Sequence, residues 1–311
     1  MIMGNTLYIV VPCYNEREAL PLSAPLLLDK LSALAGAGLA SAESRILLVD
    51  DGSRDETWSI IERLHREDAR FLGLRLSRNR GHQRALWAGL EYASAHADAS
   101  ISIDADLQDD LAAMDEMMKH FSGGCDVVYG VRSKREKDSF LKRFTAEGYY
   151  KVIAAMGGEV VFNHADYRLL SRRAMQALMT YPERDLFLRG MVPMLGFKTA
   201  RVEYERGVRN AGESKYTLKK MLTLALDGVI SLSVRPIRFI SGLGALLLAA
   251  ALVTLIVFAC TGASTAAVAA VSAWGAAGLV LTALGVLGEY IGHIYDEVKA
   301  RPRYFIMDIL E

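Results

Sequence analysis

A stretch without any charged residue, from Phe239 to Gly288, limits the possible folds of this chain more than any other feature of its sequence. A helix that crosses a bilayer needs about 20 apolar residues. The stretch therefore has room for two such helices, joined by a turn at Cys260–Thr265. A buried helical hairpin in a soluble domain is the alternative, but soluble core helices seldom lack charges over such a length. The sequence predicts a membrane protein with a C-terminal hairpin of two transmembrane helices, at about 237–259 and 267–291.

Basic residues flank both outer sides of this hairpin, whereas its turn has no charge. Arg235 and Arg238 precede the first helix, and Lys299, Arg301 and Arg303 follow the second. Because short cytoplasmic loops are enriched in Lys and Arg, both chain ends are expected in the cytoplasm and the turn outside. The predicted parts are a cytoplasmic domain at 1–213, a juxtamembrane amphipathic helix at 214–236, the membrane helices within 237–293, and a cytoplasmic tail at 294–311.

Two segments mix basic and apolar residues, as helices that lie in a membrane interface do. The first covers about 138–156, within the cytoplasmic domain, and the second is the juxtamembrane segment 214–236. For either segment alone, an amphipathic helix packed on the domain is an equally good interpretation. The second segment directly precedes a predicted membrane helix, which favours an interfacial position for it.

Composition mainly excludes functions. The 311 residues include 36 Lys plus Arg and 36 Asp plus Glu, so the formal net charge is zero. A general electrostatic attraction to nucleic acid is therefore not expected. The three cysteines, Cys13, Cys125 and Cys260, have neither the spacing of a zinc site nor that of a disulfide framework.

The first 130 residues alternate short apolar runs with helical patterns. This alternation predicts an α/β domain, with a mostly parallel sheet covered by helices on both faces. The predicted strands are Leu7–Pro12, Ile46–Asp50, Phe71–Ser77, Ser100–Asp104 and Asp126–Gly130, and the predicted helices cover about 17–35, 55–68, 82–96 and 110–121.

Polar clusters follow four of these predicted strands. Ligands of parallel sheets bind beyond the carboxyl ends of the strands, so four clusters at one edge favour a nucleotide site. No G-x-G-x-x-G follows a strand and no G-x-x-x-x-G-K-[ST] is present, which argues against a dinucleotide-binding fold and a P-loop NTPase. The clusters are Tyr14–Glu16, Asp50–Ser53, Asn79–His82 and Asp104–Asp106.

The fourth strand leads into a run of carboxylate and amide side chains. Such oxygens suit Mg²⁺ or Mn²⁺, and an ion of this kind commonly bridges phosphate oxygens. Either Asp109 or Asp110 is expected to cap the next helix. That role does not account for Asp104, Asp106 and Gln108, which we interpret as part of a cation-dependent site.

These motifs resemble glycosyltransferase family 2, whose members have the Rossmann-like GT-A fold. The resemblance rests on Val10–Glu16, Val49–Ser53, Asn79–His82 and Asp104–Asp109. Further segments are similar to polyprenyl-phosphate glycosyltransferases, the group of the bactoprenol glucosyltransferases and the dolichol-phosphate mannose synthases. These segments are Ala165–Leu170, Arg209–Lys215, Gly285–Gly292 and Arg301–Tyr304, of which the last two are similar to bacterial members with two spans.

The resemblance implies inverting transfer of a single sugar from a nucleotide-sugar to polyprenyl (undecaprenyl) phosphate, at the cytoplasmic face of a bacterial inner membrane. The implied donor is UDP-glucose, with amino-arabinose and mannose donors as alternatives, and the product serves the modification of cell-envelope glycans. A divalent cation, Mg²⁺ or Mn²⁺, and a homo-oligomer, a tetramer, are also implied. Two other functions remain as alternatives. One is a processive polysaccharide synthase, although the sequence lacks Q-x-x-R-W, and the other is a non-catalytic, membrane-tethered scaffold that binds sugar nucleotides.

The resemblance also assigns roles to individual residues. Asp106 and Gln108 are implied as metal ligands, and Asp104, near the ribose and the sugar, as a catalytic residue. Asp166 is implied as the catalytic base, with Arg168 beside it. A carboxylate next to a dianionic acceptor is repulsive, so an ion pair that orients Arg168, or hydrogen bonds to sugar hydroxyls, are alternative roles for Asp166. The implied nucleotide-sugar site comprises Pro12, Tyr14, Glu16, Asp51, Gly81, Asp104 and Asp106.

The acceptor side is expected to need cations more than a base. A phosphate monoester has a second pKa of about 6, so it is largely dianionic at neutral pH and already nucleophilic. Arginine holds phosphate with two parallel hydrogen bonds. The predicted acceptor-phosphate residues are Arg132, Arg143, Arg206, Arg209, Ser214 and Lys215.

Overall fold

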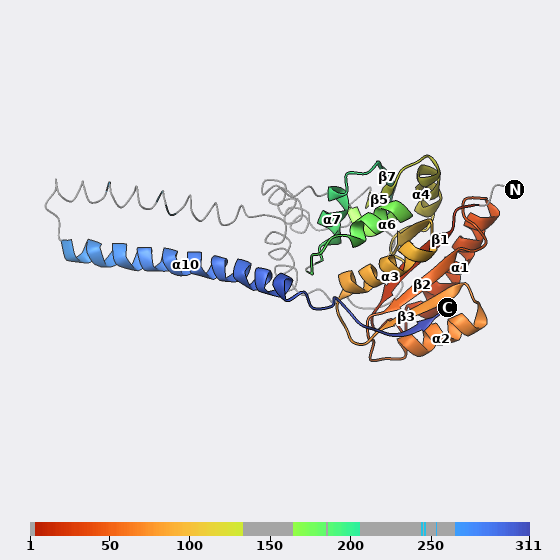
Figure 1. The fold of residues 1–311 in the computed structure, drawn as a ribbon, viewed down its shortest axis with the longest axis horizontal. Coiled ribbons are helices and arrows are strands. Elements are labelled where there is room, and N and C mark those ends of the chain that lie inside the picture. Colours follow the sequence, from red (N-terminus) through yellow and green to blue (C-terminus); the bar gives the residue numbers. More distant parts are fainter. Residues whose placement is uncertain are drawn as a thin grey trace. The chain divides into compact units, whose positions relative to one another are not determined.

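The computed structural model describes residues 4–132, 164–184, 186–205, 244, 246, 253 and 265–311. The described residues fall into two compact units. The first is built around a β-sheet and includes the last residues, Pro302–Glu311, whereas the second contains the long helix α10 (Thr265–Lys299). Figure 1 shows both units.

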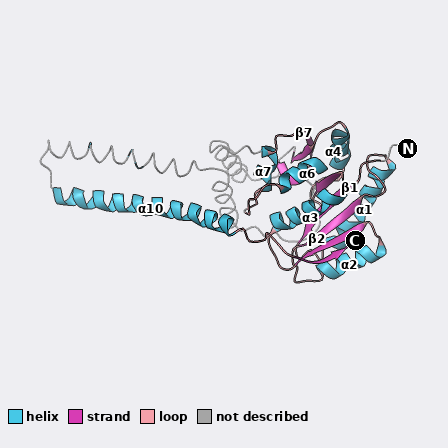
Figure 2. Ribbon diagram, viewed as in Figure 1, coloured by secondary structure: helices cyan, strands magenta, loops and turns pink. Residues whose placement is uncertain are grey.

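Within the described residues, eight strands form one sheet, which is the centre of the first unit (Figure 2). The strands are β1 (Leu7–Cys13), β2 (Arg45–Asp50), β3 (Phe71–Leu76), β4 (Ala99–Ser102), β5 (Val127–Arg132), β6 (His164–Ser171), β7 (Thr199–Tyr204) and β8 (Ile306–Leu310). Their order across the sheet is β7-β5-β6-β4-β1-β2-β3-β8. β1 pairs in parallel with β2 and β4, as β2 does with β3 and β5 with β7. β6 is antiparallel to β4 and β5, and β8 is antiparallel to β3.

Two hydrophobic clusters bury the two faces of this sheet. Side chains alternate between the faces along a strand, so that Ile9 of β1 packs in one cluster and Val10 in the other. The first cluster is completed by α1 (Leu20–Gly36), α2 (Thr57–Glu67) and α4 (Ala113–Ser122), and the second by α3 (His82–His96), α6 (Arg172–Met179) and α7 (Leu188–Met194). Burial on both faces explains why β1 is an uninterrupted apolar run.

The predicted α/β fold class with a mostly parallel sheet is confirmed. β1 to β5 and α1 to α4 lie where the alternation of patterns predicts them, within a few residues at each end. The predicted tail at 294–311 needs correction, because Pro302–Glu311 belongs to the unit of the sheet and Ile306–Leu310 is its edge strand β8. The short strand β8 pairs with β3, a strand more than two hundred residues earlier in the chain, and local sequence does not reveal such a pairing.

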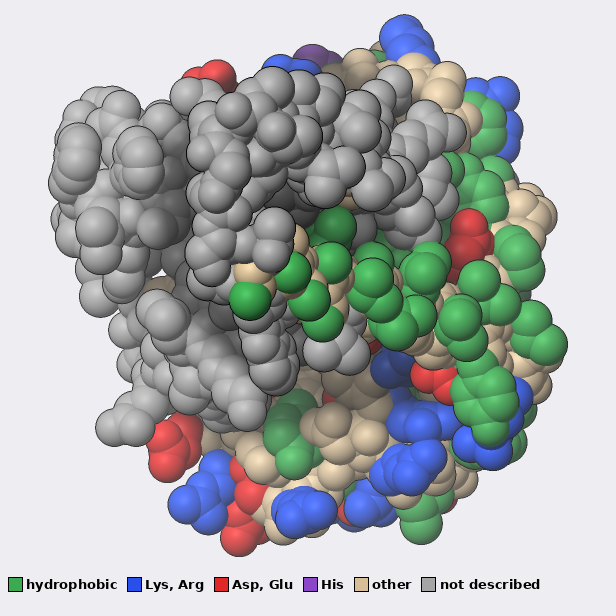
Figure 3. All heavy atoms as spheres, turned by 90° about the vertical axis from the view of Figure 1, so that its left-hand side faces the viewer, with side chains coloured by type: hydrophobic (Ala, Val, Ile, Leu, Met, Phe, Trp, Pro, Cys, Tyr) green, Lys and Arg blue, Asp and Glu red, His purple; other side chains and the backbone are tan. Residues whose placement is uncertain are grey.

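The helix α10 is long and apolar enough to cross a membrane over Gly275–Lys299, with a mean hydropathy of 1.4. It is the single helix of this kind in the part of the chain that the structure describes. Large apolar side chains along it are exposed, among them Leu284, Ile291 and Val298. Hydrophobic side chains gather on the face of the molecule that Figure 3 shows. The helix extends beyond the predicted end at about 291, because charged residues with good helix propensity, such as Glu297, continue it.

Other predicted membrane elements lie mostly or wholly outside the described residues. These are the first span at about 237–259, the interfacial helix at about 138–156 and the juxtamembrane helix at 214–236. The two-helix hairpin therefore stays a prediction.

Candidate functional site

The polar clusters predicted at the carboxyl ends of the strands do lie at one edge of the sheet. β1, β2, β3 and β4 are mutually parallel, so the residues that follow them emerge at the same edge. β6 runs the opposite way and places its beginning there. Its Arg168 pairs with Ser102 at the end of β4, and the Ser102 hydroxyl donates a hydrogen bond to the carbonyl oxygen of Asp166. The sheet topology thus brings Asp166 to the edge where Asp104 follows β4.

The loops after β1 and β2 are held together by hydrogen bonds between side chains and backbone. The backbone amide of Asn15 donates a hydrogen bond to Ser53 Oγ over 2.9 Å. The backbone amide of Arg54 donates to the side-chain oxygen Oδ1 of Asn15, also over 2.9 Å. The Glu16 amide donates to Thr57 Oγ1 over 2.9 Å. Asn15 has a φ of 53°, a left-handed conformation that asparagine tolerates well.

The residues predicted to contact the nucleoside lie at this edge in different environments. Tyr14 and Glu16 are half-buried in the loop after β1, which the contacts with the loop after β2 fix in place. Pro12 is a buried residue of β1, opposite Val49 of β2. Tyr14 and Glu16 are therefore better placed than Pro12 to present side chains at the edge.

Asp51 joins the end of β2 to the loop before α3. Its two carboxylate oxygens accept hydrogen bonds from the backbone amides of Arg80, over 2.7 Å, and Gly81, over 2.8 Å. The neighbouring Gly52 has a φ of 62°, and a Cβ there would lie 2.4 Å from the carbonyl carbon of Arg78. Burial raises the pKa of Asp51, although the two amides act in the opposite direction. Asp51 thus holds the backbone around Gly81, and both residues belong to the predicted nucleotide-sugar site.

An acidic group, formed by Asp104, Asp106 and Gln108, follows β4. The backbone amide of Gln108 donates a hydrogen bond to Asp106 Oδ1 over 3.3 Å, and Leu107 between them has a φ of 44°. The pKa of Asp104 is raised by desolvation, and the charges of Asp166, Asp109 and Asp106 raise it further, whereas His82 lowers it. This excess of carboxylates is an environment that favours a bound cation.

The acidic group alone does not make a complete metal site. Among the residues that the structure describes, no three His, Cys, Asp or Glu side chains gather in a way that could hold an ion. Mg²⁺ is commonly bound by one or two carboxylates together with waters and substrate phosphates. The oxygen donors of Asp106 and Gln108 therefore fit an ion that takes its other ligands from a diphosphate.

A basic group, formed by Arg168 and Arg189, faces Asp166, a carboxylate with only 11% of its side chain exposed. Arg168 donates to Asp166 Oδ1, while Arg189 of α7 donates from Nε to Oδ1 over 3.3 Å and from Nη2 to Oδ2 over 3.0 Å. Burial by itself raises the pKa of Asp166, but the charges of Arg189 and Arg168 outweigh it and hold that pKa well below its ordinary value. Asp166 is therefore an ionised anchor for two guanidinium groups.

Arg168 is itself 1% exposed, and its Nη1 donates to the carbonyl oxygen of Leu188 over 3.1 Å. This burial suits a residue that positions α7 better than one that contacts a substrate. Gln83 of α3 also connects Asp166 with α7. Its Oε1 accepts a hydrogen bond from the backbone amide of Leu188 over 3.2 Å, and its Nε2 donates to Asp166 over 3.4 Å.

His82, the first residue of α3, lies between the acidic and the basic group. Its Nε2 is 3.8 Å from Asp104 Oδ1 and 3.7 Å from Asp166 Oδ2. The side chain is 37% exposed, so it borders the space between the two carboxylates.

The expectation that Asp109 or Asp110 caps the helix α4 is wrong. The N-cap residue is Ala112, which makes no side-chain cap. Asp109 is buried and instead accepts hydrogen bonds from Tyr204, over 2.7 Å, and from Arg132, over 3.2 Å. Asp110 accepts from the Ala112 amide over 2.8 Å, one turn before the helix. A buried ion pair with Arg132 satisfies Asp109 better than a cap at the surface would.

Of the predicted acceptor-phosphate residues, the structure places only Arg132. It ends β5, and Asp109 and Tyr204 hold its guanidinium group. The other predicted residues, Arg143, Arg206, Arg209, Ser214 and Lys215, lie outside the described residues.

Sequence reasoning missed Arg189 and Gln83, which belong to none of the recognised motifs. A signal for Arg189 does exist. It is a lone charge in the run Leu186–Val192, most of whose other members are buried. An arginine in such a run commonly has a specific partner.

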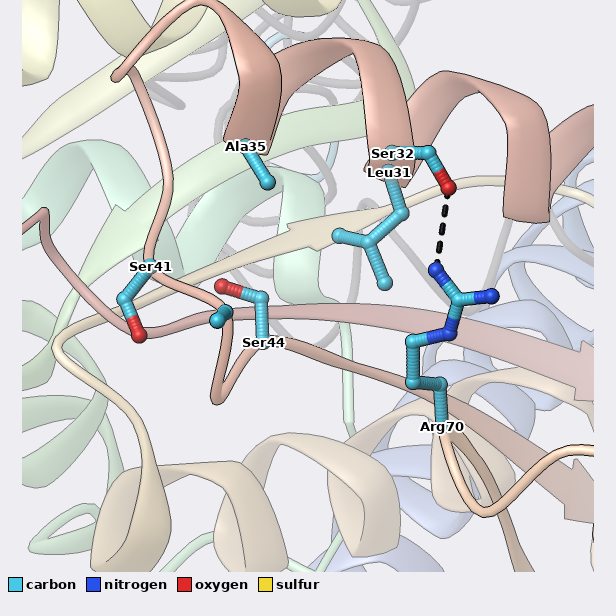
Figure 4. Close-up of a pocket in the computed structure, with 7 residues that line it drawn as sticks. Leu31, Ser32, Ala35, Ser41, Ser44 and Arg70 are labelled. Carbon is cyan, nitrogen blue, oxygen red and sulfur yellow. Dashed lines mark hydrogen bonds between the residues drawn. The ribbon is translucent and has the colours of Figure 1, made fainter.

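A cavity of about 240 Å³ lies at the opposite end of the strands, where β2 and β3 begin (Figure 4). Its lining includes Ser44, just before β2, and Arg70, just before β3. Arg70 donates to Ser32 Oγ over 2.9 Å and forms an ion pair with Asp68. Small side chains and an already paired arginine give this cavity no group suited to chemistry.

Comparisons with known proteins identify the family of this chain. The family model described as glycosyl transferase family 2 matches residues 8–179. The uncharacterized glycosyltransferase YkoT of Bacillus subtilis (strain 168) is 45% identical over 305 residues, which cover 96% of this chain and 90% of that protein. The SfII prophage-derived bactoprenol glucosyl transferase of Shigella flexneri is 37% identical over 306 residues, 96% of each chain. The solved mannosyltransferase PcManGT from Pyrobaculum calidifontis is 16% identical, with a TM-score of 0.46 and coverage of 96% of this chain and 87% of that chain, too distant to support an argument. Since the family model spans more than half of the chain and the relatives match nearly all of it, this chain belongs to glycosyltransferase family 2.

Proposed function

We propose that this glycosyltransferase transfers one glucose from UDP-glucose to polyprenyl (undecaprenyl) phosphate, with inversion at the anomeric carbon. The observation that carries the proposal is the 37% identity to the bactoprenol glucosyl transferase of Shigella flexneri over 96% of both chains. This match includes the C-terminal apolar region as well as the domain of the sheet. The product would be a polyprenyl-phosphate sugar, which serves cell-envelope glycan modification.

The acidic group is the proposed donor side. Asp106 and Gln108 would hold Mg²⁺ or Mn²⁺, which when bound neutralises the charge that develops on the departing nucleoside diphosphate. Asp104 lies next to these two ligands and faces His82, so it is placed to accept hydrogen bonds from the ribose or the sugar. The ordered loop with Tyr14 and Glu16 is the proposed site of the nucleoside base.

The proposed acceptor, a phosphate monoester, needs positioning more than activation. A dianionic phosphate oxygen attacks the anomeric carbon, the bond from that carbon to the diphosphate breaks, and a single displacement inverts the configuration. No strong base is needed, because the second pKa of the monoester is about 6. The depressed pKa of Asp166 agrees with this scheme, since so weak a base is poorly suited to take up a proton at neutral pH. Asp166 and Arg168 therefore act by positioning.

The proposed membrane arrangement is the two-span hairpin, with the sheet unit and both chain ends in the cytoplasm of a bacterium. β8 supports this arrangement, because it follows α10 in the chain and joins the same sheet as β1 to β5. If α10 crosses the membrane, the chain between Tyr204 and Thr265 must cross it an odd number of times. The uncharged residues 239–259 are the apolar segment available for that crossing. A tetramer, which the resemblance implies, is part of the proposal.

The test is transfer of labelled sugar by the purified full-length protein in detergent, with undecaprenyl phosphate as acceptor. We expect label from UDP-glucose in the organic-extractable lipid, and less or none from UDP-galactose or GDP-mannose. Label in a water-soluble polymer would support a processive synthase instead. Absence of labelled lipid with every donor would contradict the proposal.

A further inference from the structure

Asp166 pairs with two arginines at the edge of the site. One carboxylate faces the guanidinium groups of Arg168 and Arg189, and Arg168 Nε is buried with no hydrogen-bond partner among the described residues. Asp166 thus brings two guanidinium groups together at one place, and guanidinium groups bind oxyanions with two parallel hydrogen bonds.

Arg189 is the member of this group that a ligand can reach. Its side chain is 39% exposed, whereas that of Arg168 is 2% exposed. Asp166 holds the Arg189 guanidinium through both of its carboxylate oxygens. A planar group fixed along one edge keeps a defined orientation, so little side-chain entropy is lost when a ligand binds.

The charges at this edge are also separated in space. Asp104 and Asp106 are on the acidic side, Arg168 and Arg189 surround Asp166 on the other, and His82 lies between the two carboxylates of Asp104 and Asp166. A cation is favoured on the first side and an anion on the second. Arg168 and Arg189 both pair with Asp166, so its carboxylate is compatible with an anion bound at the exposed side of Arg189.

We propose that Arg189, anchored by Asp166, forms a phosphate-binding site of this enzyme. Its ligand is a phosphoryl group of one of the two substrates, and in naming those substrates the inference rests on the proposed function. The group could be the phosphate monoester of the acceptor lipid or the diphosphate of the donor. Guanidinium suits both, because it matches two phosphate oxygens at once.

The test measures binding separately from sugar transfer. Full-length wild type and the variants Arg189→Ala, Arg189→Lys and Arg63→Ala are titrated with UDP in the presence of Mg²⁺, and separately with geranyl phosphate. Arg63 is the matched control, an exposed arginine of α2 whose Nε lies 4.0 Å from Glu67. Thermal unfolding of each variant verifies that it is folded.

We expect Arg189→Ala to weaken binding of one of the two ligands by about ten-fold or more, and Arg63→Ala to change neither by more than about two-fold. Arg189→Lys should recover part of the loss, since lysine keeps the charge but cannot make both contacts with Asp166. A loss confined to geranyl phosphate assigns the site to the acceptor, and a loss confined to UDP assigns it to the donor. Unchanged affinity of Arg189→Ala and Arg189→Lys for both ligands overturns the proposal.

Asp166→Asn distinguishes a positioning role from a catalytic base. If Asp166 positions Arg189, Asp166→Asn weakens the same ligand as Arg189→Ala does and raises KM for that substrate. A drop of kcat with unchanged binding would show a base and would contradict the anchoring role. None of the titrations requires turnover, so a wild-type enzyme that binds phosphate through Arg189 but loads no sugar on lipid would overturn only the proposed function.

Discussion

At the scale of single residues, Asp51 illustrates how a side chain of a predicted nucleotide site acts on the backbone. Asp51→Ala removes the acceptor of two amides, those of Arg80 and Gly81. Because a partly buried amide without an acceptor costs about 1–3 kcal/mol, we expect the free energy of unfolding to fall by about 2 kcal/mol or more. Chemical denaturation measures this loss, with Asp29→Ala on the exposed side of α1 as the control. Wild-type stability combined with lost UDP binding would show instead that Asp51 contacts the nucleoside.

Asp106 carries the metal prediction. Asp106→Ala removes a carboxylate oxygen from the proposed ion, so the rate of transfer should fall by about two orders of magnitude or more, with little change in the unfolding midpoint. A chelator should abolish turnover of the wild type, and added Mg²⁺ or Mn²⁺ should restore it. Asp110→Ala is the matched control, because Asp110 is an exposed neighbour whose side chain accepts a hydrogen bond from the nearby Ala112 amide. Full activity in chelator would refute the assignment.

The pH dependence should not report on Asp166. Its pKa in the folded protein lies below the ordinary value of about 3.9, so the stability it contributes is present above that value and is lost only as the pH falls further, through the folded pKa. Between about pH 4 and 7, acceptor efficiency should instead follow the second ionisation of the phosphate monoester, near 6, and fall on the acid side. Profiles of kcat/KM for wild type and Asp166→Asn should therefore have the same acid midpoint. A midpoint that shifts with Asp166→Asn would contradict this reading.

At the scale of elements, periodicity predicted the part of the fold that forms from local patterns. Strands β1 to β5 are short apolar runs between amphipathic helices, and the sequence placed them well. β6 could not be found in this way, because Asp166 and Arg168 interrupt its apolar pattern and only their mutual pairing makes them compatible with a buried strand. β8 depends on a partner far away in the chain. Arg189 could not be predicted either, because its pairing with Asp166 depends on the position of α7 beside β6 in the folded chain.

The segment between α10 and β8 is fixed to the sheet unit by Arg303. Its guanidinium lies 4.2 Å from the centre of the Trp87 ring and donates to the carbonyl oxygens of Tyr181, over 2.6 Å, and Glu183, over 2.8 Å. Tyr181 and Glu183 lie in the connection from α6 to α7, the helix that carries Arg189. Arg303 thus holds the segment before β8 against the connection that leads into α7.

We expect Arg303→Ala to lower the free energy of unfolding by about 1–3 kcal/mol, since it leaves two carbonyl groups without their charged donor and uncovers the Trp87 ring. Amide hydrogen exchange should increase in residues 181–194, ahead of the strands of the sheet. The exposed Arg301 supplies the control variant Arg301→Ala. Equal protection of α7 in the Arg303→Ala variant and the wild type would show that the contact does not hold this element.

At the scale of the whole molecule, the membership of β8 in the sheet restricts the topology. Residues on both sides of the C-terminal apolar region belong to one unit, so a chain that enters a membrane after Tyr204 must return before Ile306. Basic residues flank the region on both sides, and the positive-inside rule therefore predicts a cytoplasmic position for that unit. The proposed topology therefore combines an even number of crossings with a cytoplasmic sheet unit.

Cysteine labelling tests this topology in intact cells, in a background where Cys13, Cys125 and Cys260 are replaced by serine. Ser264→Cys, in the predicted external turn, should react with a membrane-impermeant maleimide, because the turn is uncharged and is expected outside. Ser59→Cys, at an exposed position of α2, should stay unlabelled until the cells are opened. Retained transferase activity of both variants verifies that the labelled protein is native. Reaction of Ser59→Cys from outside, with Ser264→Cys protected, would reverse the orientation and place sugar loading on the external face.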